Sequence, residues 1–254
     1  MNLIDSLPLS LPLLALGFAV FTLAGFVKGV IGMGLPTVAL ALLAAVMTPA
    51  QAAAILVAPS MFTNLWQMFS GPYLVALVRR LALMEIGLGL GAWAGAGVLT
   101  GSNSKQAALG LGLALVAYAL LGLSKIEFSI PRRAEIFVGP LVGIATGLVM
   151  AATGVFVLPA LPYMQAIGLQ KDELVQALGL HFTVSTVALA GVLWSGSAFT
   201  AQIMMLSLVA IVPAVIGMII GQRVRHAISV NTFRICLFAL LLVLGLQLAA
   251  RNLL

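Results

Sequence analysis

The stretch GFVKGVIGMGLPTVALALLAAVM, residues 25–47, decides how this sequence must fold. It is too long and too apolar for a soluble helix, yet it contains Lys28 and a Gly-x-Gly-x-Pro interruption at residues 32–36. Glycine exposes the backbone and proline removes a donor, so a helix that begins near Leu11 is expected to break there. In lipid a broken helix is tolerated only where protein or a water-filled cavity satisfies the freed backbone groups. The interruption is therefore a candidate functional site.

The composition predicts an all-α polytopic membrane protein. Of the 254 residues, 63% are hydrophobic and 7% are charged, whereas a typical soluble domain has about 25% charged residues. The net charge of +6 comes from basic residues in short loops. These are typical of topology signals in a lipid bilayer, so no nucleic-acid partner is expected. Cys236 is the only cysteine. The sequence shows no zinc-type cluster or nucleotide-binding loop, and no cofactor is expected.

The apolar runs fall into two similar halves separated by a polar segment. Residues 73–80, with Arg79 and Arg80, are expected to form a loop between runs. We predict a first transmembrane repeat at 1–123, a cytoplasmic linker at 124–135 and a second repeat at 136–254. The expected runs are about 11–31, 34–47, 50–70, 82–100 and 106–123 in the first half, and about 136–151, 155–168, 172–195, 201–222 and 231–250 in the second.

Glycine motifs recur in the same order in both halves, which indicates an internal duplication. Gly25-x-x-x-Gly29 matches Gly143-x-x-x-Gly147, and Gly91-x-x-x-Gly95 matches Gly217-x-x-x-Gly221. Small residues at this spacing let helix backbones approach closely, so packing is the expected role of Gly87, Gly91 and Gly95.

Basic residues predict how the halves are oriented. If each half makes an odd number of crossings, most basic residues share one face, as the positive-inside rule favours. The halves are then inverted and both termini lie outside. The shared face would hold Arg79, Arg80, Lys125, Arg132, Arg133, Lys171, Arg223 and Arg225, and the opposite face Lys105 and Arg251.

Inverted repeats with discontinuous helices are the pattern of secondary transporters. We expect broken or re-entrant helices near Gly32–Pro36 and Thr153–Pro159. Short helices beginning near Met33 and Thr153 would aim backbone N–H groups at the protein centre, a site that favours a small anion. Gly32, Gly34, Thr153 and Gly154 are therefore candidate substrate-binding residues.

The two halves resemble the repeats of the sulfite exporter TauE/SafE family. The first resemblance lies in GFVKGVIGMGLPTVALALL and TPAQAAAILVAPSMFTNLWQ, and the second in GIATGLVMAATGVFVLPALPYMQAIGLQKDELVQALGLHFTVST. It extends from about Ala24 to Leu248. The resemblance implies a permease of the bacterial inner membrane for sulfite, thiosulfate or small organic anions. Both interruptions depart from the family's glycine-rich pattern, so the resemblance implies the class of transporter rather than one anion.

Polar side chains in the apolar runs are the remaining candidates for substrate binding. Lys28 would pair with an anion, unless it snorkels to the interface. Ser60, Thr63 and Asn64 share a helix face with Gln67, and the matching helix in the second half offers His181, Thr183 and Ser185. Hydrogen bonds between helices are the alternative role for these residues.

His181 is a candidate carrier of a coupling proton, although a neutral packed histidine is the alternative. No acid lies near His181 in the sequence, and Glu85 is placed close to the end of a run, so no buried carboxylate relay is expected.

We predict a transporter and not an enzyme. The alternatives are a membrane scaffold without transport activity, a channel and, least favoured, an intramembrane enzyme, which would need a convergent catalytic constellation. The sequence leaves the anion, the direction of transport, the coupling ion and the oligomeric state undecided.

Overall fold

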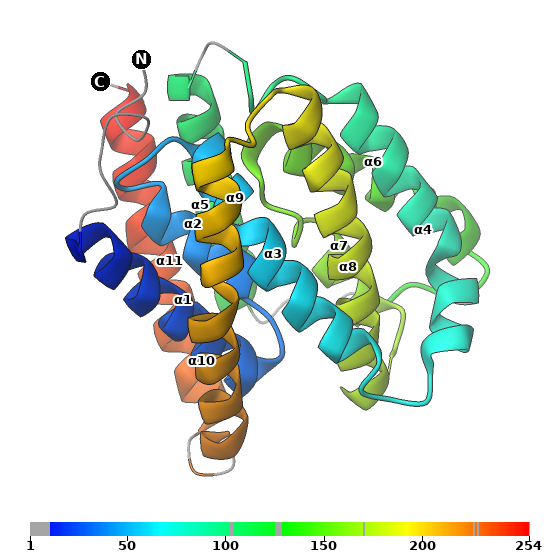
Figure 1. The fold of residues 1–254 in the computed structure, drawn as a ribbon. Coiled ribbons are helices and arrows are strands. Elements are labelled where there is room, and N and C mark those ends of the chain that lie inside the picture. The colour runs from blue at the N-terminus through cyan, green and yellow to red at the C-terminus, as the bar shows by residue number, and fades with distance from the viewer. Residues whose placement is uncertain are drawn as a thin grey trace.

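The computed structural model describes residues 11–101, 104–124, 129–169, 171–225, 227 and 229–253. These residues form helices and no strands. Lys125, part of the predicted linker, lies outside them. The helices are α1 (Leu11–Ile31), α2 (Leu35–Leu43), α3 (Pro49–Met68), α4 (Leu74–Ala94), α5 (Ser104–Leu123), α6 (Glu135–Thr153), α7 (Ala160–Ala166), α8 (Lys171–Ser195), α9 (Ala201–Val209), α10 (Ile211–Val224) and α11 (Val230–Leu253) (Figure 1).

Within the described residues, six helical segments are long and apolar enough to cross a membrane. Many of their large apolar side chains point outward; Trp194, for example, is 72% exposed. The chain is therefore an all-helical membrane protein, as its composition predicts. The six segments are Leu14–Ile31, Lys105–Leu123, Glu135–Thr153, Asp172–Ser195, Ala201–Val224 and Asn231–Leu253.

Helices α1 and α10 pack closely and run in the same direction. A side chain at Gly25 would clash with the backbone carbonyl of Ala214, and one at Gly29 with the carbonyl of Met218. Since the residue numbers rise together along both helices, the pair is parallel. Glycines at four-residue spacing permit this backbone contact.

Helices α4 and α6 form a second parallel pair with the same kind of contact. A side chain at Gly87 would clash with the carbonyl of Pro140, and one at Gly91 with the carbonyl of Ile144. At Gly95 an added Cβ atom would lie 2.8 Å from the Cβ atom of Ala151. The packing role predicted for these three glycines is confirmed.

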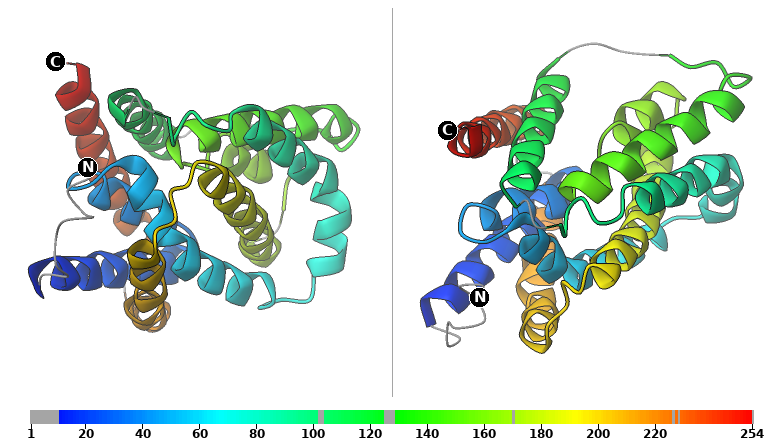
Figure 2. Two further views of the ribbon diagram at one scale, coloured as in Figure 1. Left: turned by 45° about the horizontal axis from the view of Figure 1, so that its top comes forward. Right: turned by 90° about the horizontal axis from the view of Figure 1, so that it is seen from above.

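Two further pairs are antiparallel. In α3 and α8, Asn64 bonds to Thr186 whereas Met68 bonds to Gln176, so the residue numbers run in opposite directions. In α5 and α11, Gly112 lies against Ala249, and the earlier residue Phe238 contacts the end of α5. The α3–α8 pair lies between the two parallel pairs (Figure 1), and α5 lies beside α11 in the view from above (Figure 2).

Both predicted helix interruptions are present. Helix α1 ends at Ile31, and Gly32 and Gly34 have positive φ angles of 79° and 102°, which glycine adopts without strain. Helix α6 ends at Thr153, followed by Gly154 with a φ of 78°. The short helices begin later than predicted, at Leu35 and at Ala160.

The delay before α7 has a local cause. Gly154 adopts the left-handed conformation that commonly ends a helix. Pro159 then lacks the backbone N–H that a continuing helix would use there. Residues 155–159 are therefore not helical, and α7 is only 7 residues long.

The loop predicted at residues 73–80 is wrong, because α4 already begins at Leu74. The turn before it is held by α8, where the Gln176 side chain accepts from the N–H of Tyr73 at 2.8 Å. Arg79 and Arg80 consequently lie on the helix itself. Arg79 is exposed there, whereas Arg80 is partly buried and pairs with Glu135.

The run predicted at 201–222 is divided into α9 and α10 at Ala210. Pro213 explains the division, since its ring clashes with the carbonyl four residues earlier, at Val209, and offers it no donor. The two helices together still form one candidate membrane span.

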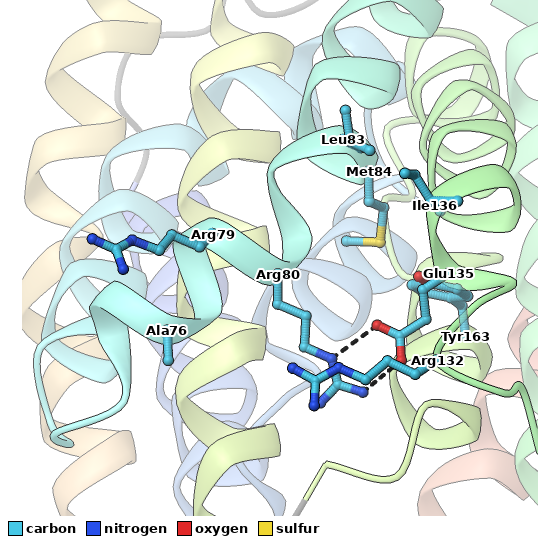
Figure 3. A pocket seen from close by; sticks show the side chains of 10 residues that line it. Ala76, Arg79, Arg80, Leu83, Met84, Arg132, Glu135, Ile136 and Tyr163 are labelled. Atoms are coloured by element: carbon cyan, nitrogen blue, oxygen red, sulfur yellow. Dashed lines mark hydrogen bonds and ion pairs between the residues drawn. The ribbon is translucent and has the colours of Figure 1, made fainter.

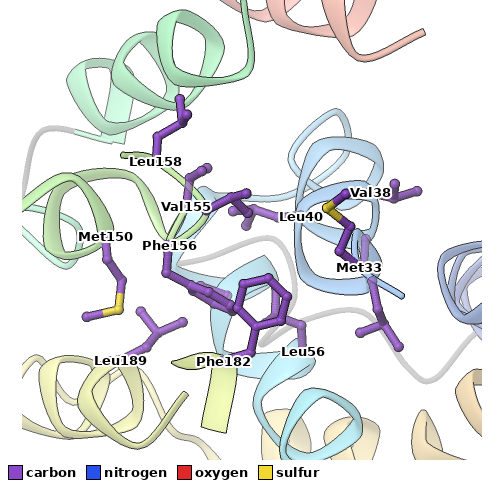
Figure 4. Close-up of a cluster of buried hydrophobic side chains, with 14 of the residues drawn as sticks. Met33, Val38, Leu40, Leu56, Met150, Val155, Phe156, Leu158, Phe182 and Leu189 are labelled. Carbon is purple, nitrogen blue, oxygen red and sulfur yellow. The ribbon is translucent and has the colours of Figure 1, made fainter. Parts of the chain in front are cut away.

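An apolar cluster fills the space where the two interruptions approach each other (Figure 4). Met33 and Leu40 come from the first interruption and α2, and Val155 and Phe156 from the second. The ring of Phe156 meets that of Phe182 edge to face, with centroids 5.5 Å apart. Both interruptions are thus held against the α3–α8 pair by apolar contacts.

Candidate functional site

Lys28 is buried in the last turn of α1, with 3% of its surface exposed. Its Nζ atom donates to Thr63 Oγ1 at 3.1 Å and to Asn64 Oδ1, both on α3. Among the described residues no carboxylate lies within ion-pair distance of this ammonium group. The Lys28 side chain therefore does not snorkel to the interface. The oxygens that accept hydrogen bonds from its amine are neutral.

The two acceptors are held in place by other helices. Thr63 donates its own hydroxyl hydrogen to the carbonyl of Pro59 at 2.8 Å, which turns the oxygen lone pairs toward Lys28. Asn64 Nδ2 donates to Thr186 Oγ1 on α8 at 3.2 Å. A chain of hydrogen bonds thus joins α1, α3 and α8 through one buried cluster.

Gln67, one turn after Thr63 and Asn64 on α3, forms hydrogen bonds to the first interruption and to α8. Its Nε2 atom donates to the carbonyl of Gly32 and to the carbonyl of Val175, each at 2.8 Å. The Oε1 atom of the same amide is buried without a partner. Gly32 therefore contacts the cluster through its backbone, whereas an added Cβ on Gly34 would face Val27 and Leu237.

Thr153 and Gly154 do not join the Lys28 cluster. Thr153 Oγ1 donates to Val149 at 2.7 Å and accepts from the N–H of Val155 at 3.1 Å, so its hydroxyl stabilises the second interruption itself. A Cβ atom at Gly154 would lie 3.1 Å from Leu40. These two residues shape the second interruption against α2.

His181 has a carboxylate partner that the sequence did not predict. Its Nδ1 atom lies 3.0 Å from Glu85 Oε1, and its Nε2 atom lies 3.0 Å from the carbonyl of Phe156. Ser185 Oγ is 3.5 Å from the same Nε2 atom. The expectation that no buried carboxylate lies near His181 is wrong, because the contact between α4 and α8 brings together residues 96 positions apart.

The protonation of this pair follows from its partners. A carbonyl oxygen only accepts, so His181 Nε2 carries a hydrogen that it donates to Phe156. The contact with Glu85 needs one further proton, either on Nδ1 or on the carboxyl oxygen. Glu85 and His181 thus share one proton in their hydrogen bond, and the second carboxyl oxygen, Oε2, has no partner.

The candidate residues therefore form two clusters that meet on α8. Lys28, Thr63 and Asn64 make the first cluster with Thr186, and His181 and Ser185 make the second with Glu85. Ser60 is buried one turn from Thr63, and its hydroxyl has no partner. Thr183 bonds back to Gly179 within its own helix.

Glu85 and Thr186 were missed as site residues, although signals for both exist in the sequence. Glu85 is a carboxylate within the otherwise apolar LALMEIGLGLG, and such residues mark functional sites by default. Thr186 directly follows Ser185. Sequence spacing alone cannot show that its hydroxyl faces Asn64.

A cavity of about 480 Å³ lies at the polar end of α4 and α6 (Figure 3). Arg79, Arg80 and Arg132 line it with Glu135 and Tyr163. Arg80 forms a two-bond ion pair with Glu135, with N–O distances of 2.6 and 2.9 Å, and also donates to the carbonyl of Ile167. This contact joins the starts of α4 and α6 to the end of α7.

The fold and site define a class of protein: an all-helical membrane protein with interrupted helices around buried, hydrogen-bonded ionisable groups is typical of membrane transporters. The family model described as Sulfite exporter TauE/SafE matches residues 17–248. The chain belongs to this family, and the resemblance seen in the sequence is confirmed. No curated protein and no solved structure matches the chain.

Proposed function

We propose that this protein is a secondary transporter that moves a small anion, such as sulfite or a sulfonate, across the bacterial inner membrane. The observation that carries the proposal is Lys28, a buried amine held by neutral oxygens beside a helix interruption. A buried charge is costly unless it is paired. An anionic substrate would supply that pairing. The anion would be bound only in the conformation in which Lys28 contacts the substrate.

Lys28 retains the capacity to bind a substrate. An ammonium group has three donors, and the side-chain bonds to Thr63 and Asn64 use two of them. The third donor would bind the anion. Ser60, on α3 close to Thr63 in the sequence, has an unpaired hydroxyl that would bind it as well. Family membership supports the class of substrate, since the family is described as a sulfite exporter.

We infer that residues 1–123 and 136–254 form inverted repeats joined by the linker 124–135. The helix directions support this. Corresponding helices of the two halves, α3 with α8 and α5 with α11, run antiparallel, as inversion requires. The cross-pairs α1–α10 and α4–α6 are both parallel, and this agreement also fits the symmetry, because inversion would exchange one pair for the other. Helices α2 and α7 would then be the equivalent re-entrant segments.

Alternating access suits this arrangement better than an open channel. Lys28 is 3% exposed and the apolar cluster fills the space between the interruptions, so a substrate needs a rearrangement to reach it. Rocking of one inverted repeat against the other is the usual rearrangement in such folds. The shared proton of Glu85 and His181 would serve as the coupling ion, since α4 and α8 belong to different repeats.

The experiment is uptake of ³⁵S-labelled sulfite, thiosulfate and methanesulfonate into proteoliposomes, with and without a pH gradient. We expect saturable uptake of at least one anion. Lys28→Met should lower it more than tenfold, because a charge-assisted bond contributes about 1.5–3 kcal/mol. Lys105→Met, at an exposed lysine in the first turn of α5, is the matched control and should leave uptake unchanged.

Other results would contradict the proposal. Flux that does not saturate would indicate a channel. A lack of uptake of every anion tested, together with stable co-purification of another protein, would indicate a scaffold. Uptake that is unaffected by Lys28→Met would remove Lys28 from the binding site.

A further inference from the structure

A second cavity, of about 630 Å³, extends from one end of the molecule to both helix interruptions. Exposed Gln165, on α7, and Asn231, at the start of α11, line its outer part. Met33 and Leu158, both less than 8% exposed, line its inner part. Met33 belongs to the first interruption and Leu158 to the second. The cavity is therefore a vestibule that ends where the two interruptions lie.

Arg234 is the only charged residue among those that line the vestibule. Its Nε atom is buried and has no hydrogen-bond partner, and no carboxylate among the described residues pairs with the guanidinium. A guanidinium presents its donors in a planar fork that matches an oxyanion. The vestibule thus has one positive charge without a carboxylate partner, and one donor of that side chain is unpaired.

Aromatic contacts hold Arg234 in this position. Its guanidinium carbon lies 6.0 Å from the ring centroid of Phe238, and that ring meets Tyr118 edge to face at 5.1 Å. A side chain at Gly122 would clash with the Phe238 ring, so glycine is needed on α5 for the stack to form. Tyr118 in turn donates to the sulfur of Met33 at 3.6 Å. The stack therefore connects Arg234 directly to the first interruption.

Lys28 is close to Met33 along the chain. The N–H of Gly32 bonds to the carbonyl of Lys28 at 2.8 Å, so Met33 follows the lysine by little more than one helical turn. Lys28 itself does not line the vestibule. An anion in the vestibule would thus be separated from Lys28 by the first interruption.

We propose that the vestibule is a second anion-binding site, in which Arg234 binds the oxyanion of the substrate on the predicted cytoplasmic side before or after it meets Lys28. The proposal rests on the proposed transport function. A positive charge without a carboxylate partner in a confined cavity raises the local concentration of anions. Gln165 and Asn231 add amide donors there, and the volume lies within the range of about 300–1,000 Å³ usual for ligand sites.

Transport kinetics in inside-out and right-side-out vesicles test the role of Arg234. For the anion transported best in the panel above, we expect Arg234→Gln to raise KM about tenfold from the cytoplasmic face and to leave kcat within about twofold. Arg234→Lys, which keeps the charge, should raise KM less. KM from the opposite face should not change, because the vestibule opens at one end only.

A second variant avoids any damage to the aromatic stack. Asn231 is exposed, and Asn231→Asp places a negative charge at the mouth of the vestibule. We expect KM from the cytoplasmic face to rise about threefold through repulsion of the anion. Thr232→Asp adds the same charge at the next position, which is exposed and does not line the vestibule, and should have a smaller effect.

Equilibrium binding of ³⁵S-thiosulfate to the purified protein separates this site from the Lys28 site. Lys28→Met should abolish transport yet keep binding in the vestibule, whereas Arg234→Gln should lose that binding. Unchanged KM in both Arg234→Gln and Asn231→Asp would overturn the vestibule site and leave the transport function intact. Loss of all binding in Lys28→Met would show a single site. A wild-type protein that transports no anion would overturn both proposals.

Discussion

The two buried ionisable side chains at the centre of this protein are stabilised differently. His181 lies against the carboxylate of Glu85, so its charge can be balanced within the protein. Lys28 has only the neutral oxygens of Thr63 and Asn64. A buried pair can hold a proton without a substrate, whereas a buried amine with neutral partners keeps its charge only if a ligand balances it and otherwise loses its proton. This difference favours substrate binding for Lys28 and proton exchange for His181.

Substitutions in the Lys28 cluster should separate stability from transport. Asn64→Leu keeps the branch at Cγ but leaves the amine without its amide acceptor, which should cost about 3 kcal/mol and lower the unfolding midpoint by about 8 °C. Lys28→Met removes the charge itself and should leave the midpoint nearly unchanged. The double variant should recover most of the loss, as thermal unfolding in detergent can measure. Equal destabilisation in all three variants would show that Lys28 is held by packing alone.

Proton coupling should depend on the pair formed by Glu85 and His181. Glu85→Gln keeps a hydrogen-bond donor toward Nδ1 and mimics the protonated acid, so the fold should persist while the exchangeable proton is lost. We expect uptake to lose its acceleration by a pH gradient, whereas exchange of labelled for unlabelled anion continues. The measurement is uptake with and without the gradient, compared with exchange in the same proteoliposomes.

His181→Gln is a second variant for the same coupling and should give the same loss. A gradient response equal to that of the wild type in either variant would contradict the proton role. Glu173→Gln, at an acid near the start of α8 and away from His181 in the sequence, is a control for the loss of one carboxylate.

At the scale of helices, glycine decides which elements can touch. Gly143→Ala should separate α4 from α6, because the added Cβ atom would clash with the carbonyl of Met84. Such overpacking typically costs about 1–3 kcal/mol, and we expect the unfolding midpoint to fall by roughly 5 °C. Gly89→Ala is the matched control, since Gly89 is exposed and no other described helix lies within 4 Å of the point where an added Cβ atom would stand. There the midpoint should stay constant or rise with helix propensity.

Helix boundaries could be predicted where apolar runs end at polar residues or glycine, as at Ile31 and Leu123. Partners could not. The sequence showed that Gly25-x-x-x-Gly29 and Gly217-x-x-x-Gly221 suit close packing, but it gave no sign that these two motifs contact each other. The same limit explains Glu85, whose partner lies 96 positions away. Local patterns predict elements, and contacts between halves depend on the folded chain.

At the scale of the whole molecule, the proposed inversion of the two halves has a direct consequence for their loops. The segment between α2 and α3 in the first half corresponds to the segment between α7 and α8 in the second. In inverted repeats these segments lie on opposite sides of the membrane, and in parallel repeats they lie on the same side. Val46 and Asp172 are exposed residues at these corresponding places.

Cysteine labelling therefore tests the inversion. With Cys236→Ala as the background, Val46→Cys should react with a membrane-impermeant maleimide in intact cells, because the positive-inside rule places that end outside. Asp172→Cys should react only after lysis, since Ile167, a few residues earlier in the chain, bonds to Arg80 at the arginine-lined end of α4 and α6. Labelling of both from one side would mean parallel repeats. The antiparallel course of α3 and α8 would then need another origin, and rocking of inverted halves could not be the transport mechanism.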